Sequence, residues 1–402
     1  MTHADALRRV LDRAEMDGWT GSDPYDALLS PIGRAVTRLG PLPRFVLSQV
    51  VLRVPLARTL AKPPGSVNTK ALALFLGAVT RGRDLLGASR PRELAGELVR
   101  EIERRAAPAG DGLGWGYPFP WQSRSFWAPA GTPNAVVTAT VGWHALDCAG
   151  AFQDDTAHAL GLAAARFLAS GLRTTPYEPD GSALSYTAMD ETRVVNISAL
   201  GSRLLLRAAT LSGEPHLADT GARLLRFVIR AQGPDGTWPY AVDRGGSWMD
   251  SFHTGYVLES LIDARELGYP VPDGVLSRGI EAYGRFFGPD GSARLTLPEE
   301  SPLDGHSAAQ GIVTYAAIAA SETMSLSQRE AARTAALEIA AWSLRRLWVS
   351  GEAHFAFQIR GGRRDEREFL RWVQAWMALA MATVESLRRA EEPATAIPVA
   401  VT

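Results

Sequence analysis

The sequence predicts an all-α protein, an (α/α)6 toroid of six helical hairpins with short β-hairpin loops on one rim. Three observations support this: an apolar helix recurs six times, an amphipathic helix follows it, and a Gly- and Asp-rich segment leads into the next repeat. The repeats start about 55 to 70 residues apart, which suits two helices and a loop. The apolar helices begin at Ala71, Thr138, Ser198, Thr254, Gln310 and Val373.

The two kinds of helix differ in their apolar pattern. The first helices are apolar on almost every side, as helices buried on two sides must be. The second helices, such as those within 215–232 and 326–347, have apolar residues at three- and four-residue spacing with Arg and Glu between them. We therefore expect the first helices to line a barrel and the second helices to shield them from solvent.

Three regions are expected along the chain. Residues 1–64 are predicted to form an N-terminal helical arm packed outside the toroid, 65–390 the toroid, and 391–402 a disordered C-terminal tail. Within the arm, 42–62 carries bulky apolar residues with Arg and Lys spaced among them. This stretch could make a peripheral contact with an anionic membrane surface, or it could pack against the main domain.

Composition excludes several classes of function. A net charge of -1 and a pI of about 6.7 give no basic surface for nucleic acid. The single cysteine, Cys148, excludes an intrachain disulfide framework and a cysteine-rich zinc site. No close His/Asp ligand spacing indicates a metal, so no metal ligand and no cofactor are assigned, and the metal requirement stays open. The sequence leaves the oligomeric state open.

The expected location follows from the absence of targeting signals. The first residues are charged and helix-patterned, unlike a signal peptide. No stretch reaches the roughly 18 uninterrupted apolar residues of a membrane span. We therefore predict a cytoplasmic protein, with peripheral contact to the inner membrane through 42–62 as an option.

Four of the segments that lead into an apolar helix share a pattern. Each has a turn, a short alternating strand and then an Asp just before the helix: Asp190, Asp250, Asp304 and Asp365. Such an Asp commonly caps a helix by accepting hydrogen bonds from free backbone N–H groups. The topology also puts all four carboxylates on one rim of a central cavity, and the two roles are compatible.

Two of these segments add histidines, and this predicts acid/base chemistry. Asp250 and His253 are three residues apart at a helix start, so they can face the same cavity. His306 follows Asp304 in the next repeat, and Asp190 lies in the preceding one. We predict that Asp250 and His253 transfer protons, helped by Asp190 or His306. The alternative is that these histidines are structural residues.

A loop at 114–134 concentrates aromatic residues among Pro and Gly, where a regular helix could not bury them all. Aromatic faces pack against sugars or isoprenoid chains, and the polar residues among them favour sugars, whose hydroxyls need directional partners. Alternatively, the loop is a hydrophobic lid. The predicted substrate-binding residues are Trp115, Tyr117, Trp121, Gln122, Arg124, Asn134, Arg193, Asn196, Trp248, Tyr256, Arg371, Trp372 and Gln374.

Arg371 has two possible roles. At the start of the last apolar helix it could hold a substrate carboxylate in a bidentate pair. It could equally form an ion pair with Asp365, Glu366 or Glu368, which are close to it in the sequence.

Three stretches, 114–148, 235–261 and 369–381, resemble a family of α/α-toroid proteins associated with bacterial polysaccharide biosynthesis. They read GWGYPFPWQSRSFWAPAGTPNAVVTATVGWHALDC, DGTWPYAVDRGGSWMDSFHTGYVLESL and FLRWVQAWMALAM. The resemblance implies a fold similar to six-hairpin glycosidases, glucuronyl epimerases and the terpenoid cyclase and prenyltransferase toroids. It does not select a reaction, since one fold supports many.

With the resemblance, these residues predict a carbohydrate-active enzyme. It would act on a sugar or uronic-acid unit of a bacterial polysaccharide or its lipid-linked precursor, as a hydrolase, lyase or epimerase, at the mouth of the toroid. One alternative is a terpenoid cyclase or prenyltransferase-like enzyme, because Gln232 and Trp238 resemble a structural motif of terpenoid cyclases. Another is a non-catalytic glycan-binding or assembly protein.

Overall fold

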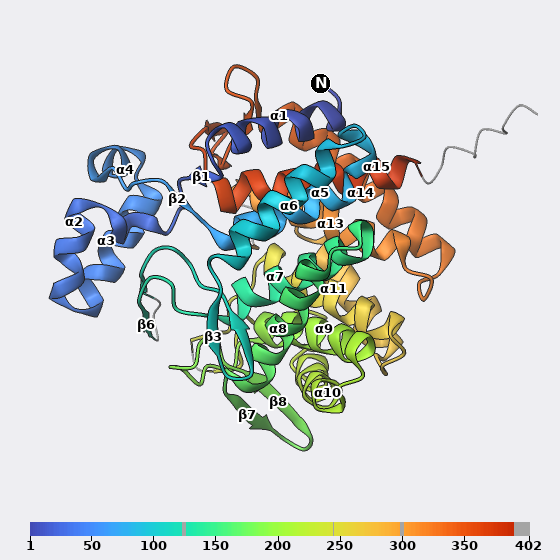
Figure 1. Ribbon diagram of the computed structural model, residues 1–402. Coiled ribbons are helices and arrows are strands. Elements are labelled where there is room, and N and C mark those ends of the chain that lie inside the picture. The colour runs from blue at the N-terminus through green and yellow to red at the C-terminus, as the bar shows by residue number, and fades with distance from the viewer. Residues whose placement is uncertain (123–125, 244, 298–300, 390–402) are drawn as a thin grey trace, which may run out of the picture.

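The computed structural model describes residues 1–122, 126–243, 245–297 and 301–389. Within them, six inner helices form a closed ring, in which each packs against the next and the last packs against the first (Figure 1). These inner helices are α5 (Thr69–Arg81), α7 (Ala135–Phe152), α9 (Val195–Ser212), α11 (Ser251–Glu266), α13 (Gly305–Ala320) and α15 (Ala375–Arg389).

Each inner helix packs against an outer helix, which confirms the predicted toroid. The outer helices, in the same order, are α6 (Arg90–Glu103), α8 (Asp155–Ser170), α10 (Pro215–Arg230), α12 (Asp273–Gly284), α14 (Leu326–Arg346) and α1 (His3–Met16). The N-terminal helix α1 thus covers the C-terminal helix α15. The sequence pattern predicts α1 as part of an arm outside the toroid, whereas its apolar face, with Leu7, Val10 and Leu11 buried, completes the sixth hairpin.

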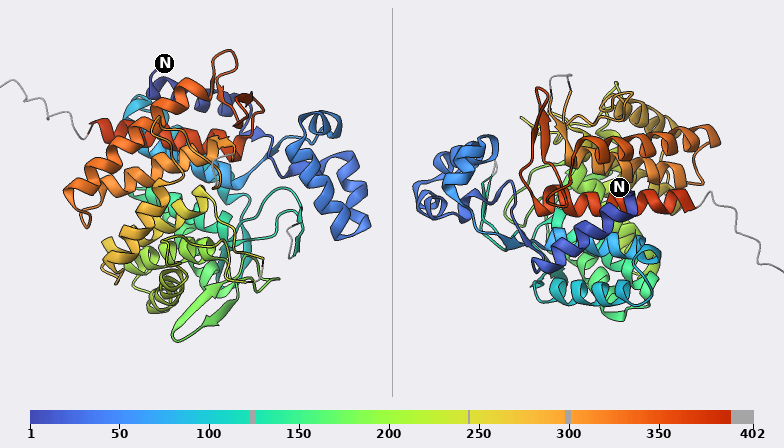
Figure 2. Two further views of the ribbon diagram at one scale, coloured as in Figure 1. Left: turned by 180° about the vertical axis from the view of Figure 1, so that it is seen from behind. Right: turned by 90° about the horizontal axis from the view of Figure 1, so that it is seen from above.

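A small lobe projects from the ring, as all three views show (Figures 1 and 2). This α2–α4 lobe, residues 27–62, contains α2 (Pro31–Val36), α3 (Pro41–Arg53) and α4 (Pro55–Ala61). It has a core of its own around Ala27, Val51 and Ala61, separate from the main core. The tail 391–402, expected to be disordered, lies outside the described residues.

The strands are short and antiparallel, and each described strand lies between an outer helix and the next inner helix. The first pair joins β1 (Thr20–Gly21), after the outer helix α1, to β2 (Ser66–Val67), before the inner helix α5. The others are β3 (Ala107–Ala109) with β4 (Gly112–Gly114), β5 (Trp121–Gln122) with β6 (Trp127–Ala128), β7 (Thr174–Tyr177) with β8 (Gly181–Leu184), β10 (Trp348–Val349) with β11 (His354–Phe355), and β12 (Gln358–Arg360) between β9 (Leu303–Asp304) and β13 (Arg363–Asp365).

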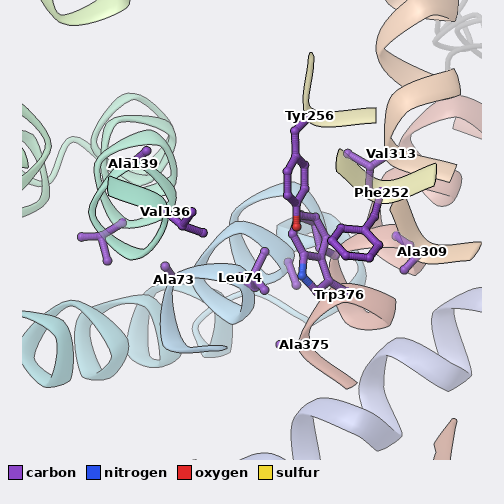
Figure 3. Close-up of a cluster of buried hydrophobic side chains, with 14 of the residues drawn as sticks. Ala73, Leu74, Val136, Ala139, Phe252, Tyr256, Ala309, Val313, Ala375 and Trp376 are labelled. Carbon is purple, nitrogen blue, oxygen red and sulfur yellow. The ribbon is translucent and has the colours of Figure 1, made fainter. Parts of the chain in front are cut away.

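The centre of the ring is filled by side chains that the inner helices send inwards. Figure 3 shows such side chains from α5, α7, α11, α13 and α15, with Phe252, Tyr256 and Trp376 as the largest rings labelled. Tyr256 and Trp376 stack with ring centroids 5.6 Å apart. In the described part of the chain, none of the helices combines the length and apolar character needed to cross a bilayer.

Candidate functional site

A cavity of about 650 Å³ opens at the rim where the outer helices lead into the inner ones. Its volume falls in the usual range for small-molecule sites, about 300 to 1,000 Å³. Much of its described wall is aromatic, and this suits a ligand with flat apolar faces. The aromatic lining residues are Tyr25, Phe45, Tyr117, Phe119, Trp121, Phe126, Tyr186, Tyr240, Trp248, Phe252, Tyr256 and Trp372.

Asp250 and His253 form a hydrogen-bonded pair in the cavity wall. Asp250 caps α11: its Oδ1 accepts the backbone N–H of His253 at 2.8 Å, and its Oδ2 lies 2.7 Å from His253 Nδ1. A buried carboxylate needs such partners, and Asp250 is only 3% exposed. Because the carboxylate accepts the Nδ1 proton, it leaves Nε2 of His253 as the ring nitrogen that can exchange a proton with a ligand.

A second chain of polar groups runs from α5 to α13. The Tyr256 hydroxyl lies 3.1 Å from His306 Nε2 and 3.4 Å from Lys70 Nζ. Burial lowers the pKa of Lys70 well below its usual value, and the positive charge of Arg371 lowers it further. Burial, with Lys70 nearby, also lowers the pKa of His306, and burial raises the pKa of Tyr256. At neutral pH the imidazole and the phenol are therefore both uncharged.

Arg371 pairs with Asp23, not with the acids next to it in sequence. Its Nη2 donates to Asp23 Oδ1 at 2.8 Å and its Nε donates to Oδ2. Burial opposes the charge on Arg371, but Asp23 more than compensates and raises the arginine pKa. The guanidinium also lies 5.1 Å from the ring centroids of Tyr117 and Trp372. The pair thus joins the N-terminal segment to the cavity wall.

The structure brings together most of the residues that the sequence proposed for the site. The cavity wall includes Tyr117, Trp121, Gln122, Asn196, Trp248, Asp250, His253, Tyr256, His306, Arg371 and Trp372. Arg124 lies outside the described residues. The other proposed residues, Trp115, Asn134, Asp190, Arg193 and Gln374, do not line the cavity, because each is engaged elsewhere.

Three of them stabilise the fold around the cavity. Trp115 is fully buried, and its Nε1 donates to the carbonyl of Ile102 at 2.8 Å. Asn134 caps α7 by accepting the backbone N–H of Val137. The amide of Gln374 makes two hydrogen bonds, each 2.8 Å long, to the backbone of Phe355.

Asp190 and Arg193 belong to the loop before α9. Asp190 accepts hydrogen bonds from the backbone and hydroxyl of Thr187 and of Thr192, so it organises its own turn. Arg193 donates to the carboxylate of Asp243. Two repeats further on, Asp304 caps α13 and accepts from Gln358, with burial raising its pKa. Among the four rim acids, Asp250 is the one that lines the cavity in the described structure.

Several cavity residues are not predicted by the sequence pattern. Lys70 is the most informative, because it is a lysine only 3% exposed at the start of an apolar helix. A lysine directly before the apolar run Ala71–Leu76 could have indicated a site residue, since lysine is almost never fully buried unless it is paired. Tyr25 and Phe45 come from the segment expected to lie outside the toroid, and no local pattern places them here.

The cavity therefore offers groups suited to acid/base chemistry. It holds an imidazole oriented by a carboxylate, a phenol hydrogen-bonded to a second imidazole, a buried amine and a paired guanidinium. In the described ranges, no three or more His, Cys, Asp or Glu residues are grouped so that they could hold a metal ion.

Comparison with known proteins shows the fold but no sequence family. Neither a scan against protein-family models nor a search of curated proteins gave a match. Among solved structures, a GH76 α-mannanase from Bacteroides thetaiotaomicron has a TM-score of 0.61 at 12% identity, covering 81% of this chain and 88% of that chain. Cellobiose 2-epimerase from Bacillus thermoamylovorans has a TM-score of 0.60 at 11% identity, covering 80% and 88%.

An unsaturated glucuronyl hydrolase from Bacillus sp. GL1 has a TM-score of 0.56 at 16% identity, covering 82% of this chain and 88% of that chain. At these identities the likeness shows the fold alone. The chain has the six-hairpin toroid seen in glycoside hydrolases and sugar epimerases.

Proposed function

We propose that this protein is a carbohydrate-active enzyme that moves a proton at a carbon atom of a sugar, as an epimerase or a lyase does. One observation carries the proposal: both carboxylates of the described cavity wall are occupied by protein donors, whereas an imidazole and a phenol face the cavity. Asp250 is bound to His253, and Asp243 accepts the backbone N–H of Arg193 at 2.6 Å and its Nε at 2.8 Å. Glycoside hydrolysis usually needs two carboxylates free to act on the bond.

The geometry suggests a role for each group. His253 Nε2 would take the proton from a carbon next to a carbonyl or carboxylate, with Asp250 fixing the orientation of the ring. Tyr256, hydrogen-bonded to His306 and Lys70, would donate to the oxygen on which negative charge develops. His253 and Tyr256 both lie on α11, with ring centroids 5.9 Å apart, so one ligand could reach both.

Substrate binding would use the aromatic wall. Trp248 stacks on Tyr240 with centroids 4.3 Å apart and is 41% exposed, so it presents a flat face at the cavity. Gln122 and Arg371 add polar groups for hydroxyls or a carboxylate. In keeping with the family resemblance, we propose a sugar or uronic-acid unit of a bacterial polysaccharide or of its lipid-linked precursor as substrate.

The test is a product analysis by NMR in heavy water with a panel of reducing disaccharides, uronic-acid oligosaccharides and lipid-linked glycans. The proposal predicts a new sugar isomer or an unsaturated product, with deuterium incorporated wherever a proton returns to carbon. New reducing ends without either product would make the enzyme a hydrolase. Binding without turnover across the panel would support a non-catalytic glycan-binding protein.

The aromatic wall also favours a second candidate, a terpenoid cyclase or prenyltransferase-like enzyme, since aromatic rings stabilise cationic groups. Gln232 and Trp238 fit this candidate only structurally: Gln232 Nε2 donates to the carbonyls of Gly236 and Val275, and Trp238 Nε1 donates to that of Val228. Conversion of an isoprenoid diphosphate or epoxide in the same assay, with no sugar turnover, would establish this candidate.

A further inference from the structure

The α2–α4 lobe exposes apolar side chains at helical spacing. On α3, Leu42, Val46 and Val50 follow one another at four-residue intervals, and on α4 Leu56 and Leu60 do the same. Leu42, Leu56 and Leu60 are 72%, 67% and 70% exposed. Helical stripes of this kind normally face a core, but the core of this lobe is built from other residues.

The same lobe carries positive charge without any acid. Residues 27–62 contain six basic residues and no Asp or Glu, in a chain whose net charge is -1. Arg58 is paired with Asp26, just outside the lobe. The basic residues with exposed side chains are Arg34, Arg38, Arg53 and Lys62.

We propose that the α2–α4 lobe is a docking surface for an anionic lipid membrane. Exposed leucine and valine can enter the boundary between headgroups and acyl chains, while Arg and Lys pair with anionic headgroups. The lack of any acidic residue favours this occupant, because a membrane surface of one charge sign would be repelled by acids in the lobe. The inference goes beyond the proposed function and does not depend on it.

The side of α3 next to its exposed apolar stripe contributes to the cavity. Phe45 and Gln49 line the cavity, and the guanidinium of Arg44 lies 4.1 Å from the ring centroid of Trp127 in β6. The hairpin of β5 and β6 includes Trp121, which also lines the cavity. Docking through the lobe would therefore hold the cavity wall close to the lipid surface.

Vesicle co-sedimentation of the full chain tests the proposal. We expect binding to vesicles of phosphatidylcholine with phosphatidylglycerol, at least about tenfold weaker binding to pure phosphatidylcholine, and loss of binding as salt increases. The double variant Leu56→Ser with Leu60→Ser should bind the anionic vesicles at least about tenfold more weakly. Arg34→Gln with Arg38→Gln should reduce the preference for anionic lipid.

The matched control is Leu326→Ser, which removes a leucine 73% exposed on α14, away from the lobe. It should bind vesicles like the wild type, and all variants should keep the wild-type melting temperature. Three results would overturn the proposal: no binding to either vesicle, equal weakening by Leu326→Ser, or a concentration-dependent dimer that the Leu56/Leu60 variant dissociates. The last would make the lobe an interface between two copies of the chain.

Discussion

The two ends of the toroid interior differ in how a buried cation is paired. At the end away from the rim cavity, a space of only about 30 Å³ is lined by Trp143, Arg203 and Glu259, among others. There Arg203 is paired with two acids: its Nη1 donates to Glu259 at 3.1 Å, and it also binds Asp263. Glu259 in turn accepts the hydroxyl of Thr314 at 2.9 Å.

In the rim cavity of the described structure, some buried polar groups lack a partner. Lys70 forms no ion pair with a carboxylate of the described residues, and its hydrogen-bond partner there is Tyr256. His306 Nδ1 and Asn196 Oδ1 have no partner among the described residues. Trp143 Nε1 and Trp376 Nε1, in the wall of the far space, also have no partner in the described ranges, so the contrast rests on the cations. Since a buried cation is normally paired, the comparison suggests that Arg203 stabilises the fold and that Lys70 is kept for a ligand. Tyr256 lines both spaces.

The largest expected effect is on turnover at the cavity. His253→Gln and Asp250→Asn should each lower turnover about a hundred- to ten-thousand-fold, with folding retained because Asn is also a good N-cap. The measurement is turnover beside melting temperature. Asp304→Asn is the matched control, since Asp304 caps the next inner helix without lining the cavity. Equal loss of turnover per folded molecule in Asp304→Asn would make the Asp250 effect structural.

The far cluster should show the largest effect on stability. Arg203→Met should lower the free energy of unfolding by about 3 to 5 kcal/mol, because Glu259 and Asp263 would lose their buried partner. Urea unfolding measures this. Arg265→Met provides the control: its partner Asp273 is 83% exposed, so the change should stay within about 1 kcal/mol. A similarly small change in Arg203→Met would contradict the structural role.

Lys70→Met should lower activity without lowering stability, unlike Arg203→Met. Methionine is similar in length and removes a buried amine whose pKa burial lowers, so the free energy of unfolding should stay equal or rise. Turnover should fall about ten- to a hundredfold, because Tyr256 loses a hydrogen-bond partner. If stability drops as in Arg203→Met while turnover per folded molecule persists, the contrast between the two clusters fails.

The smallest effect concerns pH. Burial lowers the pKa of His306, so below about pH 6.5 the unfolded chain binds a proton that the folded one does not. The free energy of unfolding should therefore decrease as the pH is lowered, by at most about 1.4 kcal/mol per pH unit from this group. His306→Phe keeps a ring against Phe252 and should flatten the dependence in urea unfolding between about pH 5 and about pH 7. An unchanged slope would show that His306 does not contribute.

The toroid could be predicted from sequence because its signals are local and repeated. Apolar periodicity marks each inner helix, and an Asp in the segment before four of them marks the rim, so these signals place Asp250 and His253 at the cavity end of the ring. The pairing of Arg371 with Asp23 could not be predicted, because the two residues are distant in sequence and meet only when the ring closes.

The errors in the site have a similar cause. Trp115 and Trp121 belong to the same aromatic loop, yet Trp115 points into the core and Trp121 into the cavity. Composition cannot distinguish such orientations. Asp190 and Asp250 also share a repeat position, but neighbouring threonines engage Asp190 in its own turn.

The most direct test of the proposed proton transfer is deuterium exchange into the sugar substrate, followed by NMR for the wild type and for His253→Gln. We predict that the wild type exchanges one carbon-bound proton with solvent and that His253→Gln loses this exchange while keeping the wild-type melting temperature. Exchange that persists in folded His253→Gln would contradict the proposal, as would turnover that yields only new reducing ends.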